Sequence, residues 1–318
     1  AMGGVLGCLP SVREQGRAPR LRAPNASPAC DVVVKIGGSA CTKKAVFETL
    51  NEEALNASAK QLGALMRDGI TMAVIHGAGS FGHQQAREFG VSKGTGGEGA
   101  PVYPLTQRLL EGAAKTRLSV TTLNKHVVTA LIGEGLPAIT ISPCPFVGTE
   151  KKKLLGGRLP QGAADGVVEL LKRGLVPVVH GDVVLDEAQG LAILSGDVWM
   201  VEFCRELGAR HAVFLTDVDG VFTAPPTEPG AELVREILVD PETGELELTG
   251  VSMNCASHDV TGGLKAKLES AAEVLLQAPS VQCVFIVRAG SDAAAEALRG
   301  KIPERGTTLR RRPASKAS

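Results

Sequence analysis

Three observations predict an α/β protein built on a mostly parallel sheet that is covered on both faces. Short apolar runs alternate along the chain with longer segments whose apolar residues recur every three or four positions. Glycine-rich turns directly follow several of the apolar runs. Hydrophobic residues make up 44% of the 318 residues, which is enough for a large core. Strands that alternate with helices are typical of parallel sheets with helices on both faces.

The first strand and helix show how each element is recognised. Asp31–Ile36 is a short apolar run that ends at Gly37 and Gly38, as a buried strand does. Between Leu50 and Met66 the apolar residues share one helical face, and Gly69 is placed to end that helix. The same reasoning predicts further strands at Thr71–His76, Ala138–Ser142, Leu175–His180, Ala212–Thr216 and Val281–Val287. It predicts further helices near Gly82–Phe89, over Pro104–Leu131, and at Ala164–Lys172, Asp197–Leu207, Leu264–Gln277 and Asp292–Leu298.

Three segments depart from the alternation of strand and helix. Val183–Leu194 predicts a hairpin with its turn at Glu187–Gly190. Gly94–Gly99 predicts a mobile loop. Residues 224–262 are rich in Pro, Gly and Glu, so we expect them to be irregular.

The two ends of the chain differ from the body in composition. Residues 1–30 lack periodicity and are rich in Pro, Gly, Ala and Arg, so we expect a flexible extension. Leu309–Ser318 predicts a solvated basic tail. The seven cysteines are odd in number and widely spaced, which favours reduced thiols and a cytoplasmic location. An organelle transit peptide stays open as an alternative, because the first residues are rich in Arg and poor in acids.

The formal net charge of zero is an average over unequal parts. Residues 1–30 carry a net +3 and residues 299–318 a net +6, which leaves −9 for the body. A body of this charge with few aromatic residues does not predict a nucleic-acid surface. No apolar run approaches the length of a membrane span, so we expect no membrane partner. An anionic ligand would have to be bound by a few placed cations.

Gly77–Gly82 fits the G-x-G-x-x-G pattern of dinucleotide folds, but its surroundings do not. That fold needs an acidic residue about 20 positions later, at the end of a strand, and Glu98 follows no predicted strand. The same stretch nearly matches the nucleophile elbow of hydrolases around Ser80, with Ala78 at the first glycine position. A dinucleotide-dependent oxidoreductase and a hydrolase are therefore disfavoured.

Backbone N–H groups of glycine turns bind phosphate or carboxylate oxygens at helix starts. Two such turns follow early strands, and a third glycine pair at Gly262 and Gly263 precedes Lys265 and Lys267. Several anion sites with lysines nearby indicate phosphoryl transfer from a phosphate donor to an anionic acceptor.

Several motifs along residues 31–309 resemble the amino-acid-kinase superfamily. They are Val34–Ser39, Thr216–Val221 and Asp259–Lys267. His76–His83, His180–Asp186 and Ile193–Asp197 are similar to the isopentenyl phosphate kinase family within it. The resemblance implies a three-layer α/β/α sandwich, a homodimer, and transfer of the ATP γ-phosphate to isopentenyl phosphate. Dimethylallyl phosphate is a second candidate acceptor.

The resemblance also divides the chain. It implies a single kinase domain over residues 31–309, between a flexible extension at 1–30 and a basic tail at 310–318. Residues 31–195 would form mainly the acceptor lobe and residues 196–309 mainly the ATP-binding lobe.

The resemblance assigns roles to individual residues. Four side chains would act on the phosphates during catalysis: Lys35, Lys44, His83 and Lys267. Lys43 lies beside Lys44 and leaves that assignment open. The acceptor site would include Ala78, Gly82, His83 and Gly196. The nucleotide site would include Lys35, Gly37, Gly38, Ser39, Gly79, Asp217, Gly263 and Lys267.

Other expectations concern the metal, the tail of the acceptor and the helix caps. Mg²⁺ should bridge the ATP phosphates and be held by them, so we expect no protein metal ligands. Asp197 is a candidate helix cap, and Asp219 a candidate turn residue. Candidates for an apolar slot for the tail are Phe89, Leu105, Leu109 and Phe146.

Two alternatives stay open besides the oxidoreductase. A sister kinase could act on fosfomycin, an acyl-amino acid or a nucleoside monophosphate, and fosfomycin kinase shares a histidine similar to His83. A nucleotide-binding sensor without catalysis is disfavoured by the presence of Lys35, Lys44, Asp217 and Lys267.

Overall fold

A nine-stranded sheet forms the centre of the computed structural model, which describes residues 28–95, 102–249 and 262–313. Its strands lie in the order β13-β12-β15-β14-β9-β1-β2-β6-β3. Their bounds are β1 Val32–Ile36, β2 Met72–His76, β3 Ala138–Ile141, β6 Val176–His180, β9 His211–Thr216, β12 Glu236–Val239, β13 Leu246–Thr249, β14 Cys283–Arg288 and β15 Thr307–Arg311. Only the β14–β15 and β12–β13 pairs of this sheet are antiparallel, so the prediction of a mostly parallel sheet is confirmed.

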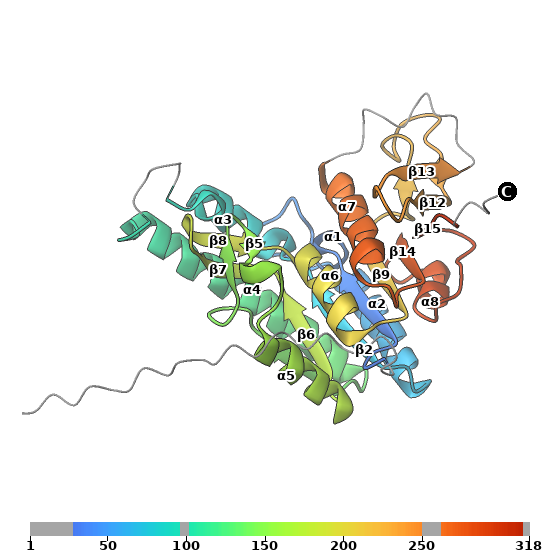
Figure 1. Ribbon diagram of the computed structural model, residues 1–318, viewed down its shortest axis with the longest axis horizontal. Helices are drawn as coiled ribbons and strands as arrows, with labels where there is room; N and C mark the ends of the chain where they lie inside the picture. The colour runs from blue at the N-terminus through green and yellow to red at the C-terminus, as the bar shows by residue number, and fades with distance from the viewer. Residues whose placement is uncertain (1–27, 96–101, 250–261, 314–318) are drawn as a thin grey trace, which may run out of the picture.

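Helices cover both faces of the sheet (Figure 1). Successive side chains of a strand point to opposite faces. Val33 and Ile75 therefore join a core with α5, α6 and α7, whereas Val32 and Val34 join a core with α2, α4 and α8. This is the predicted α/β/α sandwich. The helices are α1 Gly38–Cys41, α2 Glu52–Arg67, α3 His83–Glu88, α4 Gln107–Gly133, α5 Gln161–Lys172, α6 Gly196–Leu207, α7 Gly262–Gln277 and α8 Asp292–Ala297.

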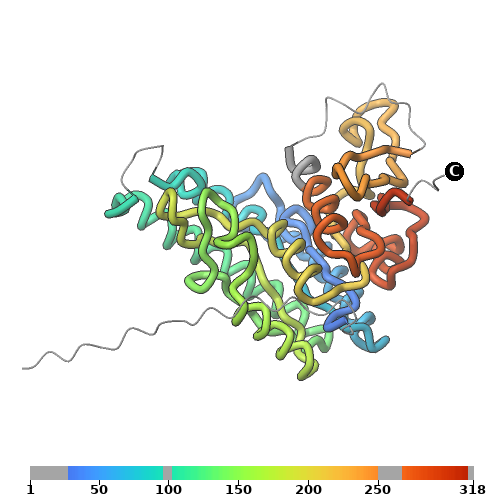
Figure 2. Tube along the Cα trace, viewed as in Figure 1, coloured from blue at the N-terminus to red at the C-terminus, as the bar shows by residue number. Residues whose placement is uncertain are grey.

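The first strand lies in the middle of the molecule, with later segments on both sides of it (Figure 2). Its neighbours are β2 and β9, and Ile36 at its end is in register with His76 and Leu215. The carboxyl ends of these parallel strands therefore lie side by side, which brings the turns that follow them together.

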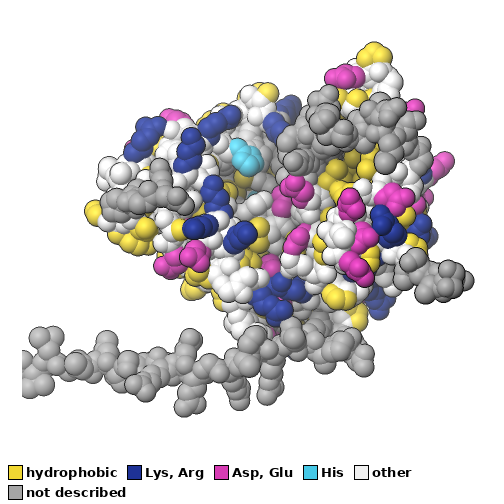
Figure 3. Space-filling view, turned by 45° about the horizontal axis from the view of Figure 1, so that its top comes forward, with side chains coloured by type: hydrophobic (Ala, Val, Ile, Leu, Met, Phe, Trp, Pro, Cys, Tyr) yellow, Lys and Arg dark blue, Asp and Glu magenta, His cyan; other side chains and the backbone are white. Residues whose placement is uncertain are grey.

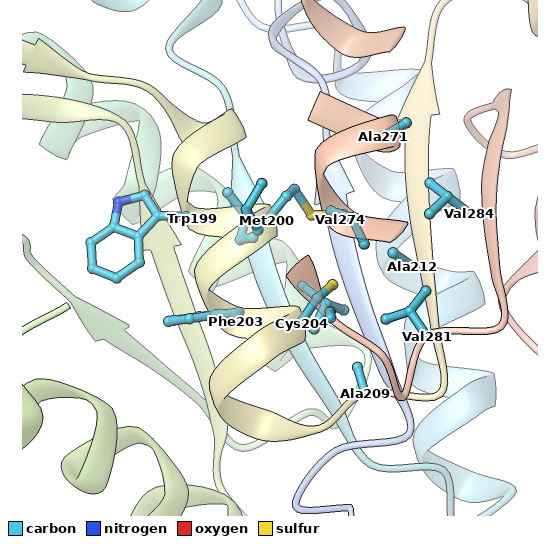
Figure 4. Close-up of a cluster of buried hydrophobic side chains, with 14 of the residues drawn as sticks. Trp199, Met200, Phe203, Cys204, Ala209, Ala212, Ala271, Val274, Val281 and Val284 are labelled. Carbon is cyan, nitrogen blue, oxygen red and sulfur yellow. The ribbon is translucent and has the colours of Figure 1, made fainter. Parts of the chain in front are cut away.

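The inner face of α6 is the apolar centre of one layer (Figure 4). Trp199 and Phe203 meet edge to face with ring centroids 5.2 Å apart. Met200 and Cys204, on the same helix, are fully buried and face the side of α7 and β14. This packing fixes the start of α6, where Gly196 and Asp197 lie.

A smaller four-stranded sheet, ordered β5-β4-β7-β8, stands beside the main one. Its strands are β4 Gly148–Glu150, β5 Lys153–Leu154, β7 Asp182–Asp186 and β8 Gly190–Leu194. The antiparallel pair of β7 and β8 confirms the predicted hairpin. Val183 and Leu191 of this hairpin pack against Phe89 and Leu109 in a separate apolar cluster. Short 3₁₀ turns lie at η1 Gly79–Phe81, η2 Val91–Lys93 and η3 Leu155–Gly157.

The prediction that residues 224–262 are irregular is wrong over much of the described part. It contains β11 Leu233–Val234, which pairs with β10 Val221–Phe222, and also β12 and β13. Ile237 and Val239 point into the core while Glu236 and Leu238 alternate with them. The strands are short and lie among Pro, Gly and Glu. The alternation of buried and less buried residues was therefore not recognised in the sequence. Residues 250–261 lie outside the described residues.

The solvated tail predicted from Leu309 is also wrong for its first residues. Leu309 is fully buried in β15, whose last residues are Arg310 and Arg311. The Arg311 guanidinium donates to the carbonyl oxygens of Val281 at 2.7 Å and Ala278 at 2.9 Å. Arg311 is part of the folded body because its partners come from the end of α7 and the segment after it. Arg310 pairs instead with Glu236 of β12, at 2.6 Å.

Several expectations about the chain ends and loops fall mostly outside the described residues. Residues 1–27 and 96–101 are among these, so the extension and most of the Gly94–Gly99 loop are not described. Cys30 is fully buried, and Ala29 donates its N–H to the Leu207 carbonyl, so these two residues belong to the body. No helix in the described part of the chain is long and apolar enough to cross a membrane.

Candidate active site

The carboxyl ends of β1, β2 and β6 open into a cavity of about 630 Å³. Ligands of parallel sheets bind at this edge. Figure 3 shows lysine and arginine side chains around a hollow that also exposes a histidine. The predicted phosphate-handling residues that line the cavity are Lys35, Gly37, Gly38, Ser39, Lys44, Ala78, Gly79, Gly82, His83, Gly196 and Lys267. Four chain segments far apart in sequence therefore meet at one site.

The two glycine turns are in direct contact with each other. A Cβ atom on Gly38 would lie 2.7 Å from the Gly79 nitrogen, and one on Gly77 would lie 2.7 Å from the Gly38 nitrogen. Gly79 also has a φ of +53°, which disfavours other residues. Ala78 has a φ of −72°, so alanine is unstrained at this position. Glycine is needed here because two backbones approach closely.

Lys35 crosses from β1 to the start of α6, where its ammonium group pairs with the Asp197 carboxylate. Lys35 is nearly buried. Ser195 caps α6 by accepting the N–H of Asp197 at 3.1 Å, so the prediction that Asp197 caps this helix is wrong. The Asp197 carboxylate instead pairs with Lys35.

Lys44 and Lys43 are both exposed but face different places. Lys44 lines the cavity described here, together with Lys267. Lys43 lines a separate depression between Glu52 and His126. Burial and the positive charges of Lys44 and Lys35 lower the pKa of Lys267, so the Lys267 ammonium group is repelled by the other two. An anion between them would relieve that repulsion.

His83 is the first residue of α3 and lines the cavity. Its pKa is lowered by partial burial and by the charges of Lys44, Arg87 and Lys35. The imidazole is therefore neutral at pH 7 in the absence of an anion, with one N–H to donate. Arg87 lies one helical turn later and lines the same cavity.

Asp217 does not line the cavity itself but is connected to it through Ser39. The Ser39 hydroxyl donates to the Asp217 carboxylate at 2.6 Å. Burial alone would raise the pKa of Asp217, but hydrogen bonds from Ser39 and Thr216 and the charge of Lys44 hold it below its ordinary value. Asp217 is thus an anion that faces the lysines.

Asp219 holds the turn after β9 in place. Its two carboxylate oxygens accept from Arg288 at 2.6 Å and Arg305 at 2.8 Å. Arg288 also donates to the Asp217 carbonyl at 2.8 Å. Gly263 lies in the first turn of α7, the helix that brings Lys267 to the cavity.

Part of the cavity lining is apolar. Ala86, Val120, Ile193 and Leu194 supply it. None of the four tail-slot candidates lines the cavity: Phe89 and Leu109 are buried behind it, Leu105 packs beside them, and Phe146 is 76% exposed. The apolar part of the lining comes instead from small and branched residues of α3, α4 and β8. Which way these side chains face could not be predicted from the sequence.

Sequence reasoning missed a buried ion pair beside the cavity. Asp182 lines the cavity and is 2% exposed, and Arg117 of α4 donates to it at 2.8 Å. Burial raises the pKa of Asp182, opposed by the positive charge of Arg117 and by His180. The only signal in the sequence was that Asp182 follows a strand in the motif at His180–Asp186.

No cluster of three or more His, Cys, Asp or Glu side chains that could hold a metal occurs among the described residues. The carboxylates nearest the lysines already have partners, since Asp197 pairs with Lys35 and Asp217 accepts from Ser39. The residues present fit a magnesium ion held mainly by nucleotide phosphates.

The sheet and its lysine-lined cavity define a class of phosphoryl-transfer protein. Residues 32–286 match the model of the amino acid kinase family, and the chain belongs to this family. Within it, the chain is similar to isopentenyl phosphate kinases. That of Arabidopsis thaliana is 34% identical, over 85% of this chain and 90% of that protein. That of Methanothermobacter thermautotrophicus is 34% identical, over 78% and 86%. X-ray structures of an isopentenyl phosphate kinase match with a TM-score of 0.68 at 29% identity, over 87% and 99%.

Proposed function

We propose that this chain transfers the γ-phosphate of ATP to isopentenyl phosphate, giving isopentenyl diphosphate and ADP. One observation supports this most strongly: Lys35, Lys44, Lys267 and His83 line a single cavity. Apolar side chains of Ala86, Val120, Ile193 and Leu194 line the same cavity. Two relatives that are 34% identical to this chain carry the name isopentenyl phosphate kinase. An alkenyl monophosphate has the matching two parts, an anionic head and an apolar tail.

An oxygen of the acceptor phosphate attacks the γ-phosphorus in line. The new O–P bond forms as the bond to the bridging oxygen of ADP breaks. The attacking oxygen is already ionised near pH 7, so no general base is required. Lys44 and Lys267 neutralise the charge of the transferring group, while Lys35 and the glycine N–H groups hold the donor phosphates. His83 donates a hydrogen bond to the acceptor phosphate and thereby holds it in position.

Mg²⁺ belongs to this proposal as the ion that screens the charge of the nucleotide phosphates when it is bound. Asp197 holds Lys35 through an ion pair, and the negative charge of Asp217 acts on Lys44 and Lys267. Dimethylallyl phosphate is proposed as a second acceptor because it has the same head group and a tail of the same length. The homodimer and the cytoplasmic location stay predictions.

A coupled assay of ADP release tests this proposal. Isopentenyl phosphate, dimethylallyl phosphate, UMP and fosfomycin are compared side by side, with ATP alone as the control for hydrolysis. We expect the highest kcat/KM for isopentenyl phosphate. A higher kcat/KM for UMP or fosfomycin would favour a sister kinase, and no ADP release above the control would favour a nucleotide-binding sensor.

A further inference from the structure

Two buried histidines stand directly behind the turns that line the cavity. His76 is the last residue of β2 and His180 the last of β6, and the two are in register across the sheet. Both side chains are fully buried, with ring centroids 5.4 Å apart. Neither lines the cavity, but the glycine that follows each of them does. The mechanism above gives these histidines no role.

The hydrogen bonds of His76 determine where its proton is. Nδ1 lies 3.1 Å from the carbonyl oxygen of Gly77. A carbonyl oxygen only accepts, so Nδ1 carries the proton and Nε2 is an acceptor. Nε2 then accepts from the Asn124 amide at 3.0 Å, and the amide oxygen of Asn124 accepts from the Thr140 hydroxyl at 2.7 Å. The donors and acceptors of all three hydrogen bonds are therefore consistent with a proton on Nδ1 of His76.

The neutral form of His76 is also the one that its surroundings favour. Burial and the neighbouring His180 lower the pKa of His76 to about 3. His180 repeats the arrangement, with Nδ1 3.0 Å from the Gly181 carbonyl oxygen. The Asp182 carboxylate lies 4.0 Å from this nitrogen and opposes the shift, but burial and the charge of Arg117 lower the pKa of His180. Because the pKa of His76 is about 3, His76 stays neutral near pH 7 and keeps its proton on Nδ1.

The direction of the Gly77 carbonyl sets the direction of the next N–H. In a planar trans peptide, the C=O of one residue and the N–H of the next point in opposite directions. When His76 holds the Gly77 oxygen, the Ala78 N–H is directed to the other side. Ala78 lines the cavity, and its N–H has no acceptor among the described residues. An unpaired backbone donor at this place suits a phosphate oxygen.

We infer that His76, with its proton on Nδ1, is a positioning residue that directs the N–H of Ala78 at the acceptor phosphate. This inference rests on the proposed function, because the phosphate is that of the proposed acceptor. His180 and Asn124 support His76 through ring stacking and the hydrogen bond to Nε2. The first histidine of the His76–His83 motif is thereby given a task different from that of His83, which touches the ligand itself.

Two substitutions separate this role from simple packing. In His76→Asn the side-chain amide lies near the position of Nδ1 and can replace its N–H donor. In His76→Gln the amide lies nearer the position of Nε2, so the Gly77 carbonyl loses its donor. We expect His76→Asn to keep kcat/KM for isopentenyl phosphate within about threefold of the native value. We expect His76→Gln to lower it about thirtyfold or more, part of the loss seen when one such donor is removed. The KM for ATP should change less than about twofold in both.

His211 offers a matched control at the opposite end of the sheet. It is also buried, and its Nε2 lies 3.1 Å from the Leu298 carbonyl oxygen. His211→Asn and His211→Gln change a buried histidine of the same sheet far from the cavity, so neither should alter kcat/KM by more than about threefold. If His76→Asn and His76→Gln lose activity equally, or neither loses any, the positioning role is wrong.

Nitrogen NMR of the native protein tests the inference without relying on a folded variant. We expect His76 to show the Nδ1-protonated tautomer and no titration between pH 5 and 8. A proton on Nε2, or a titration within that range, would overturn the inference.

A phosphate titration keeps this outcome distinct from that of the proposed function. Inorganic phosphate should shift the amide signal of Ala78 in the native protein and in His76→Asn, and leave it in place in His76→Gln. Equal shifts in all three proteins, or no shift in the native protein, would refute the inference. Absence of kinase activity together with the expected shifts would instead refute only the choice of substrate.

Discussion

Lys43 and Lys44 form a matched pair on which the proposed chemistry can be tested. They are adjacent, both are exposed, and they differ in the surface that they line. Lys44 lines the cavity, and its charge acts on His83, Lys267 and Asp217 there. Lys43 lies on the separate depression beside Glu52. Replacing each lysine by alanine removes the same charge from the same loop and changes only its place.

The position of Lys44 determines how much kcat the Lys44→Ala variant should lose. Its charge acts on two ionisable groups that line the cavity, His83 and Lys267, and on Asp217 beside it, so it also acts on an anion bound among them. Removing one group that stabilises charge in a transition state typically costs about 3 kcal/mol, or a factor of roughly 100 in rate. We expect Lys44→Ala to lower kcat about 100-fold, because the other two lysines remain. Lys43→Ala should change kcat by less than about threefold.

The assay is steady-state ADP release at saturating ATP and isopentenyl phosphate, with circular dichroism to confirm that both variants are folded. A loss in Lys43→Ala equal to that in Lys44→Ala would mean that the loop, and not the charge at the cavity, matters. Near-native turnover in Lys44→Ala would refute the role of this lysine in neutralising the transferring group.

Three further predictions follow from the same geometry. Lys267→Ala should lower kcat by about 10²- to 10³-fold in the ADP assay with the fold retained, and near-normal turnover would contradict it. His83→Ala should mainly raise the KM for the acceptor. Because the pKa of free His83 is lowered and a bound phosphate raises it, binding takes up a proton, so the affinity ratio of native protein to variant should increase as pH falls from about 8 to 6. A flat ratio by calorimetry would exclude that linkage. Arg311→Ala should lower the free energy of unfolding by about 2 kcal/mol or more, since buried carbonyl groups lose a charged donor, whereas Arg310→Ala should cost less than about 1 kcal/mol. Urea unfolding measures both, and equal losses would contradict the comparison.

The sequence predicted the central strands well because their burial is uniform. Asp31–Ile36 and Leu175–His180 are runs of apolar residues, and the structure has β1 and β6 there with every residue buried. It failed at β12, where only alternate residues are buried and glutamate stands among them. It also failed at β15, because arginines read as solvated charge unless their carbonyl partners are known. Both failures concern strands whose burial depends on distant segments.

Prediction of the candidate site was likewise limited where a contact depends on segments distant in sequence. Glycines and lysines after strands pointed to the correct edge of the sheet, because parallel strands end together. The pairing of Lys35 with Asp197, across 162 positions, has no local signal. The choice between Lys43 and Lys44 depends on which way a short loop faces. The apolar slot could not be found for a similar reason, since Val120 and Ile193 meet only when α4 and β8 are packed.

The glycine pattern itself has a physical cause that its spacing alone does not reveal. Gly77–Gly82 fits a dinucleotide fingerprint, in which the glycines allow a tight turn and a close approach to pyrophosphate. Here Gly77 and Gly79 are required because a Cβ atom on either would lie 2.7 Å from a backbone atom of Gly38 in the other turn. A chain that places one glycine turn on another brings two sets of backbone donors to one cavity. That arrangement suits two phosphates held face to face better than one extended dinucleotide, which is why the partner turn, and not the motif, decides between the two functions.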